Sequence, residues 1–142
     1  MLHDGPIIVL EDDKDDEEFL MEVFSSMKVP NQIIFFKDGI AALAYLKATP
    51  EEPFLILSDV NLPKMDGLQF RSNIQNDEIL KKKSIPFVFF TTAANQQAVS
   101  KAFQLNVQGF FIKPASMTEL HNMVKHIVEY WKLSSHPSSL LK

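Results

Sequence analysis

The sequence predicts an α/β domain in which a five-stranded parallel sheet is covered by helices on both faces. Five short apolar runs recur along the 142-residue chain, and none of them alternates polar with apolar residues. Such continuous runs are typical of strands that are buried on both faces. Stretches with helical spacing lie between the runs, and this alternation implies a parallel sheet with right-handed crossovers.

The five apolar runs are the predicted strands: IIVL at 7–10, IIFF at 33–36, FLIL at 54–57, FVFF at 87–90 and GFFI at 109–112. Residues that interrupt regular structure stand between them. Asp38-Gly39 separates the second strand from its helix, and Pro53 and Pro86 each precede a strand. Pro114 is predicted to lie just inside a helix start, where its missing N–H costs little.

Apolar residues at helical spacing predict the faces that four of the five helices turn toward the sheet. The third helix, at about 66–76, has the weakest pattern. The predicted inward stripes are Phe19, Leu20, Val23, Phe24 and Met27 on the first helix, Ile40, Leu43 and Leu46 on the second, Ala98, Val99, Ala102 and Phe103 on the fourth, and Met117, Leu120, Val124, Ile127 and Trp131 on the last.

Length and composition indicate one domain without disulfides. We expect it to span residues 1–142, with a core at about 6–133 and a frayed tail at 134–142, because this length is usual for one domain. The chain has no cysteine, which excludes disulfides and thiolate metal sites. It shows neither a signal-peptide pattern nor an apolar run of membrane-spanning length. We therefore expect a soluble, cytoplasmic protein with no membrane partner.

Charge is distributed unevenly along the chain. The net charge of −4 argues against a nucleic-acid partner, because nucleic acids attract basic surfaces. The basic run KKK at 81–83 is predicted to be a solvated loop. The segment EDDKDDEE at 11–18 holds seven acids and one lysine, which indicates a solvated helix start, cation binding, or both.

Acidic residues follow two of the predicted strands. In the flavodoxin-like strand order 2-1-3-4-5, strands 1 and 3 are neighbours at the switch point where open α/β sheets form their sites. Glu11 and Asp12 follow strand 1, and Asp59 follows strand 3. Neighbouring strands are about 4.8 Å apart, so these carboxylates crowd one pocket. A hard cation such as Mg²⁺, which prefers oxygen ligands, would relieve their repulsion.

Two further strand ends point to the same pocket. Strand 4 runs into Thr91, and strand 5 runs into Lys113. An aspartate can attack a phosphoryl group and form an acyl phosphate, and Mg²⁺ with a lysine offsets charge on the phosphoryl oxygens. Asp59 is therefore interpreted as a phosphate acceptor.

Several separated motifs resemble the receiver domain of two-component response regulators: VLEDD, SDVNLPKMDG, FTTA and GFFIKP, at their mutual spacing. The resemblance covers the chain from about Pro6 to Leu133 and implies a flavodoxin-like (βα)5 three-layer sandwich. Within the family, the chain looks like small stand-alone receivers, including those paired with bacterial phytochromes. Their LNLPKMDG-type loop and their aromatic pair at the end of the last helix resemble VNLPKMDG and Tyr130-Trp131 here.

The resemblance implies a phosphoacceptor and a set of metal ligands. Asp59 would accept the phosphoryl group. Asp12 would bind Mg²⁺ directly, and Glu11 would bind it mainly through water. Asn61, two residues past the acceptor, would offer its backbone carbonyl to the metal, and the Asp59 carboxylate would complete the ligand set.

The resemblance also implies a switch. Thr91 would contact the phosphoryl group and move toward it on activation, Lys113 would pair with it, and Phe110 would move inward when Thr91 moves. Pro114 commonly follows a cis bond in the family. The chain departs from the family pattern at Thr92, where alanine is more usual and where the larger residue would narrow access to the acceptor. Phe110 lacks a hydroxyl, so this switch would work by packing alone.

The function that the resemblance implies is a signalling switch with no independent substrate turnover. A sensor histidine kinase or a histidine phosphotransfer protein would donate the phosphoryl group, and the receiver would catalyse its own phosphorylation and slow dephosphorylation. Phosphorylation would change docking to a downstream protein that the sequence does not name. The stretch at 95–108 carries one charge, Lys101, and is an expected place for a homodimer contact.

Three other functions stay open on the residues alone. A flavin electron carrier needs a hydroxyl- and glycine-rich loop after strand 1, where this chain has EDDKDD. An aspartate-dependent phosphohydrolase typically has Asp-x-Asp after its first strand, whereas Asp59-Val60-Asn61 follows the third and has no second acid. A pseudo-receiver would act as an interaction module without taking phosphate.

Other polar residues have plainer interpretations. Acids in the first turn of a helix favour its dipole, and this role is assigned to Asp13, Asp15, Asp16, Glu17 and Glu18. Asp66 is predicted to be a helix N-cap, and Gly67 is assigned to local geometry. The four histidines show no ligand spacing and are expected to be solvated.

Overall fold

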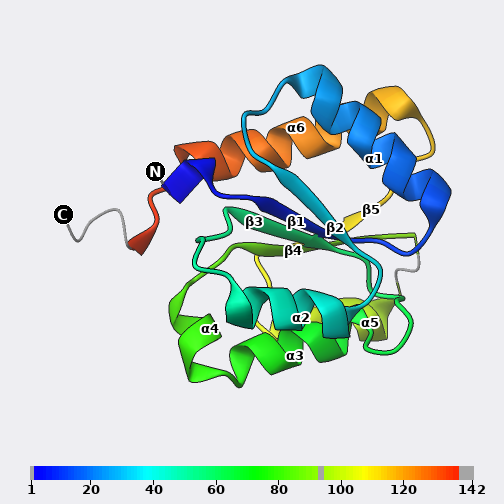
Figure 1. The fold of residues 1–142 in the computed structure, drawn as a ribbon. Coiled ribbons are helices and arrows are strands. Elements are labelled where there is room, and N and C mark those ends of the chain that lie inside the picture. The colour runs from blue at the N-terminus through cyan, green and yellow to red at the C-terminus, as the bar shows by residue number, and fades with distance from the viewer. Residues whose placement is uncertain (1, 93–94, 138–142) are drawn as a thin grey trace.

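The chain folds as the predicted three-layer α/β sandwich (Figure 1). The computed structural model describes residues 2–92 and 95–137. One parallel sheet has the predicted order β2-β1-β3-β4-β5. Its strands are β1 (Ile7–Leu10), β2 (Ile33–Phe36), β3 (Leu55–Ser58), β4 (Phe87–Thr91) and β5 (Gly109–Ile112). The helical elements are the 3-10 turn η1 (Leu2–Asp4) and the helices α1 (Lys14–Met27), α2 (Gly39–Ala48), α3 (Gly67–Gln75), α4 (Glu78–Lys82), α5 (Gln96–Gln104) and α6 (Met117–Leu133).

The sheet separates two hydrophobic cores. Helices α1 and α6 cover one face, and α2, α3 and α5 cover the other (Figure 1). Successive residues of a strand point to opposite faces. Ile7 and Val9 of β1 therefore pack in the core under α1 and α6, whereas Ile8 and Leu10 pack in the core under α2 and α3. The apolar runs are continuous because each face needs its own apolar set.

The strands at the two edges of the sheet are less buried than predicted. Every residue of β1, β3 and β4 is buried. All residues of β2 are only half-buried, and Ile112 in β5 is 58% exposed. These two strands have a neighbour on one side only, so a continuous apolar run does not guarantee burial of the edge.

The helices bury narrower stripes than the sequence predicts. The buried residues of α1 are Leu20, Val23 and Phe24, and that of α5 is Ala102 alone. The predicted stripe was wrong for four large residues, because each of these helices meets the sheet along one line and leaves its flanks in solvent. The exposed residues are Phe19, Ile40, Phe103 and Met117.

A sixth helix, α4, lies where a solvated loop was predicted for the basic run at 81–83. The Asp77 side chain accepts hydrogen bonds from the backbone N–H groups of Ile79 and Leu80, at 3.0 Å each, and Leu80 is buried. An N-cap and one buried leucine therefore suffice for a short helix. Lys81 and Lys82 form its last turn, where positive charge is favourable.

The last helix begins later than predicted, at Met117. The Ser116 side chain accepts from the backbone N–H of Glu119 and caps α6, so Pro114 lies in the preceding loop rather than inside the helix. The Lys113–Pro114 peptide bond is trans, unlike the cis bond that the resemblance implies. The backbone N–H of Lys113 donates to the carbonyl of Thr91 at 2.9 Å, and this strand pairing directs the lysine toward the sheet edge.

The end of α6 and the residues after it contact the start of the chain and the segment after α4. His3 Nε2 lies 2.8 Å from the carbonyl oxygen of Ser134, and His136 Nε2 lies 2.8 Å from that of Lys83. The Lys132 ammonium donates to the carbonyl of His3 at 2.6 Å. Residues 134–136 are therefore held rather than frayed, and these two histidines are not simply solvated. None of the described helices is both long and apolar enough to cross a membrane.

Replacement of Phe87 by alanine is expected to lower the free energy of unfolding by about 3–5 kcal/mol. Phe87 is fully buried, and its ring contacts the ring of Phe70 and the guanidinium of Arg71. Urea unfolding measures the change. Phe103→Ala removes an equal side chain that is 52% exposed and should cost about 1 kcal/mol or less. Equal losses for the two variants would contradict the packing described.

Candidate functional site

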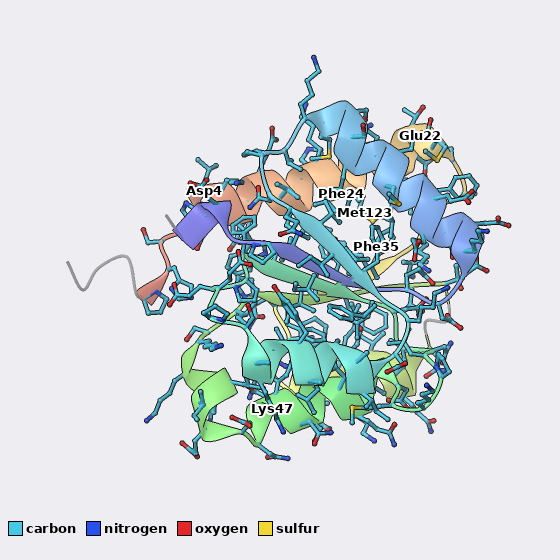
Figure 2. The ribbon with its side chains drawn as sticks, in the orientation of Figure 1. Asp4, Glu22, Phe24, Phe35, Lys47 and Met123 are labelled. Atoms are coloured by element: carbon cyan, nitrogen blue, oxygen red, sulfur yellow. The ribbon has the colours of Figure 1, made fainter. Side chains whose placement is uncertain are left out.

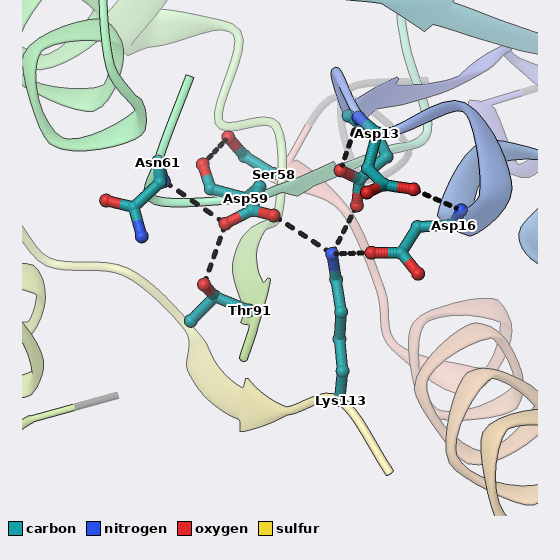
Figure 3. Close-up of polar contacts among 8 residues, drawn as sticks. Asp13, Asp16, Ser58, Asp59, Asn61, Thr91 and Lys113 are labelled. Carbon is teal, nitrogen blue, oxygen red and sulfur yellow. Dashed lines mark hydrogen bonds and ion pairs between the residues drawn. The ribbon is translucent and has the colours of Figure 1, made fainter. Parts of the chain in front are cut away.

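The carboxyl ends of β1, β3, β4 and β5 bring polar side chains to one edge of the sheet (Figure 3). Leu10 and Ser58 are paired across β1 and β3. The backbone N–H of Asp59 continues the ladder by donating to the carbonyl of Leu10 at 2.9 Å. Glu11 and Asp59, the next residues of the two strands, are therefore neighbours, as the strand order predicts.

The carboxylate of Asp59 is held by three donors. Thr91 Oγ1 donates to Oδ1 at 2.7 Å, and the backbone N–H of Asn61 donates to the same oxygen at 3.1 Å. Lys113 Nζ donates to Oδ2 at 2.9 Å. Asp59 is only 8% exposed, and a buried carboxylate needs such partners to stay ionised. Its position and orientation are thereby fixed.

The ammonium of Lys113 joins three carboxylates. Besides Asp59, it donates to Asp16 Oδ2 at 3.0 Å and to Glu11 Oε1. Burial alone would lower the pKa of Lys113, but hydrogen bonds to Glu11 and Asp59 outweigh burial and raise that pKa above its usual value. Lys113 is therefore charged over the whole pH range in which the protein is expected to work.

Glu11 is the buried acid of this cluster. Burial raises its pKa from 4.5 to about 7, and repulsion by Asp59 adds to this rise. The hydrogen bond from Lys113 and the one from the backbone N–H of Asp13 act in the opposite direction. The sheet edge thus holds a carboxyl group that a further positive charge would bring to full ionisation.

The loop after Asp59 is folded back against the sheet edge. The backbone N–H of Gly67 donates to the carbonyl of Val60 at 2.9 Å, and that of Gly39 donates to the carbonyl of Met65 at 3.0 Å. A Cβ atom on Gly67 would lie 2.2 Å from the carbonyl oxygen of Asp59. Glycine is required here because backbone approaches backbone, and Asp66 caps α3 beside it, as predicted.

Other predicted site residues lie around this cluster. Asp12, Asn61 and Thr92 are exposed at the same edge. Phe110 is half-buried, and its ring centroid lies 5.8 Å from that of Phe89. Ala93, which completes the FTTA motif, lies outside the described residues.

Asp16 joins the cluster although the sequence assigned it to the helix dipole. Its carboxylate points from the first turn of α1 toward Lys113 (Figure 3). The sequence does contain a signal for this contact, because Asp16 stands four residues before Leu20, which is buried. Residues four apart share one face of a helix, so Asp16 extends the buried stripe to the edge of the sheet.

The donor chemistry of this edge fits a hard divalent cation. Among residues 2–92 and 95–137, no three acidic or histidine side chains form a ready-made metal cluster, and Lys113 Nζ lies where three carboxylates converge. Mg²⁺ does not need such a cluster, because it keeps several waters and uses one or two carboxylates. The crowding of Glu11 and Asp59 is the physical reason to expect a cation here.

Comparison with known proteins gives one consistent result. Residues 7–125 match the model of the response regulator receiver domain. The chain is 34% identical over 130 residues to the response regulator Rcp1 of Synechocystis, with 88% of this chain and 87% of that protein covered. The narrower resemblance, to small stand-alone receivers, is also confirmed, because Rcp1 is a receiver of that kind.

Solved structures agree. The phosphorylated cyanobacterial phytochrome response regulator RcpA superposes with a TM-score of 0.83 at 33% identity, covering 94% of this chain and 97% of that one. The Mn²⁺-bound form of Rcp1 superposes with a TM-score of 0.79 at 32% identity, covering 92% and 96%. The resemblance inferred from the motifs is confirmed.

In metal-free buffer, the stability of the protein is expected to fall as pH rises from about 4.5 to about 7, relative to Glu11→Gln. The raised pKa means that the folded state binds the Glu11 proton more tightly than the unfolded state does, so deprotonation favours unfolding. The shift corresponds to about 3 kcal/mol at most. Urea unfolding of both proteins across this range tests it. A constant difference between them would contradict the prediction.

Gly67→Ala is expected to lower the free energy of unfolding by about 1–3 kcal/mol, since the added methyl would collide with the Asp59 carbonyl. Gly109→Ala is the matched control. Its Cβ would meet a ring carbon of Phe111 at 2.8 Å, and that ring can shift more easily than backbone. Urea unfolding should therefore rank Gly109→Ala above Gly67→Ala in stability, and the reverse order would refute the argument.

Proposed function

Because this chain belongs to the family of response regulator receiver domains, we propose that it takes a phosphoryl group onto Asp59 and thereby switches its contacts with other proteins. Receiver domains act in two-component systems, in which they interact with histidine kinases and downstream proteins. The single observation that carries the proposal is the convergence of Thr91, Lys113 and the Asn61 backbone on one buried carboxylate.

The chemistry proposed is nucleophilic attack by an Asp59 oxygen on phosphorus. The new P–O bond forms as the P–N bond of a phosphohistidine breaks, and the imidazole leaves with the electron pair. Lys113 would donate to the phosphoryl oxygens, and the Thr91 hydroxyl would give a further hydrogen bond. The donor would be a sensor histidine kinase or a histidine phosphotransfer protein. We expect this exchange to take place in the cytoplasm.

The proposal includes Mg²⁺ as the resident cation. Glu11, Asp12, the Asp59 carboxylate and the backbone carbonyl of Asn61 would hold it. When bound, it supplies charge that offsets the negative phosphoryl oxygens. Support comes from the oxygen-only donor set and from the raised pKa of Glu11, and Rcp1 has been described in a Mn²⁺-bound form.

The switch is proposed to run from Thr91 to the surface of α5, β5 and α6. Thr91 would move toward the phosphoryl group, and Phe110 would move inward against Phe89, which its ring already contacts. The surface carries exposed Phe103 on α5, Ile112 on β5 and Tyr130 on α6. Such exposed apolar residues suit protein docking, either to a downstream protein or to a second copy of the chain.

The proposal predicts that the protein gains one phosphoryl group when it is incubated with Mg²⁺ and a small acyl phosphate. Intact-mass spectrometry detects the gain. Asp59→Asn should abolish it, because the amide is not a nucleophile, and chelation of Mg²⁺ should do the same. The receiver catalyses its own reaction here, so no kinase is needed, and slow loss of the group after donor removal is expected.

Asp66→Asn is the matched control. It makes the same change at the cap of the helix next to the site, where asparagine also caps well, so phosphorylation should persist. If the wild-type protein gains no phosphoryl group, or if Asp59→Asn still gains one, the phosphoacceptor role is wrong. The first outcome would favour a pseudo-receiver that binds partners without phosphate.

A further inference from the structure

Asp16 makes a contact that the proposed function does not use. Its Oδ2 lies 3.0 Å from Lys113 Nζ, and its side chain is 35% exposed. The bond ties the first turn of α1 to the end of β5, two segments 97 residues apart in sequence. An acid serving only the helix dipole would have no reason to reach across the site.

Other acids satisfy the start of α1. The Asp13 side chain is the N-cap and accepts from the backbone N–H of Asp16 at 3.0 Å. Asp15 and Glu17 place further negative charge in the first turn, where it is favourable. The helix start therefore does not depend on the Asp16 carboxylate, which is used for Lys113.

The ammonium of Lys113 has no hydrogen-bond donor to spare. It carries three N–H groups, and its three carboxylate partners are Glu11, Asp16 and Asp59. The Lys113 side chain is only 8% exposed. Contact with a phosphoryl oxygen requires one of the three bonds to be given up or redirected, and Asp16 is the most exposed of the three partners.

The charge of the site gives a second reason to single out Asp16. When all three acids are ionised, the cluster carries one positive and three negative charges, a net charge of −2. The proposed Mg²⁺ would offset this net charge, but a phosphoryl donor is itself an anion and would still meet the Asp16 carboxylate beside the site. Asp16 adds to the repulsion without being the nucleophile or one of the proposed metal ligands.

We propose that Asp16 is a positioning residue that holds Lys113 at the phosphoacceptor and, through its charge, slows phosphoryl transfer to Asp59. This inference rests on the proposed function. The Asp16–Lys113 pair also borders a cavity of about 210 Å³ between α1 and the start of α6, lined by apolar residues that include Phe19, Leu20 and Met117. Both side chains of the pair already line this cavity.

The first measurement is the rate of phosphorylation by a small acyl phosphate at saturating Mg²⁺ and pH 8. Asp16→Asn keeps an oxygen acceptor for Lys113 and removes one charge, so phosphorylation should be about three- to tenfold faster, the size expected of one unit charge at a partly exposed site. Asp15→Asn makes the same change on the exposed side of the same turn and should leave the rate unchanged.

The second measurement does not depend on phosphorylation. The ¹⁵N-resolved NMR signal of the Lys113 ammonium should persist in the wild-type protein and in Asp15→Asn, because three carboxylates protect its protons from exchange with water. Asp16→Ala removes one acceptor and should shift this signal and broaden it by exchange. Lys113→Arg assigns the signal.

These outcomes separate the inference from the proposed function. Equal rates for Asp16→Asn and Asp15→Asn, or a slower Asp16→Asn, would overturn the braking role. An unchanged ammonium signal in Asp16→Ala would overturn the positioning role. If the wild-type protein takes no phosphoryl group, the proposed function and the braking role fall together, and the NMR signal alone decides whether Asp16 positions Lys113.

Discussion

The ion pairs of one buried ammonium organise the functional edge of this protein. Lys113 connects β5 to Glu11 at the end of β1, to Asp16 on α1 and to Asp59 at the end of β3. Each buried charge would be expensive alone, because low-dielectric surroundings disfavour ions. Together they are stable only when the four segments are in place. Removal of Lys113 would leave three carboxylates without their shared positive charge, so this one ammonium connects the four segments at the edge.

The pairing of the strands in the sheet brings these charged side chains together. Strands β1 and β3 are direct neighbours, and the main-chain bond from Asp59 to Leu10 extends their ladder by one step. The bond from Lys113 to Thr91 does the same for β4 and β5. The spatial order of the strands in the sheet, rather than local loop structure, therefore decides which side chains meet. This explains why the strand ends could be identified as a site before any contact was known.

Sequence reasoning succeeded where a residue's role follows from a strand end and failed where it follows from three-dimensional contact. The five strands, their order and the meeting of Glu11, Asp59, Thr91 and Lys113 were predicted, because apolar runs and polar strand ends are local signals. The link from Asp16 to Lys113 was missed because it crosses between distant segments. The short helix α4 was missed because its stability comes from one cap and one buried leucine. Exposure of Phe19 and Phe103 was missed because spacing does not reveal how wide a face the sheet covers.

A second buried charge, Arg71, contacts Phe87 at the start of β4, the end of that strand opposite the Asp59 edge. Arg71 donates to the carbonyls of Leu105 and Asn106 at 2.9 and 2.7 Å and lies over the ring of Phe87. It connects α3 to the end of α5 with no carboxylate partner among residues 2–92 and 95–137, and burial lowers its pKa to about 10. Both ends therefore bury charge, but with opposite consequences. At the Arg71 end, fixed carbonyl groups satisfy the charge, and nothing further is needed. At the Asp59 edge, Glu11 remains a carboxyl group with a raised pKa, and the net charge is negative. At this edge, unlike at Arg71, an incoming cation would relieve the unfavourable burial of a carboxylate.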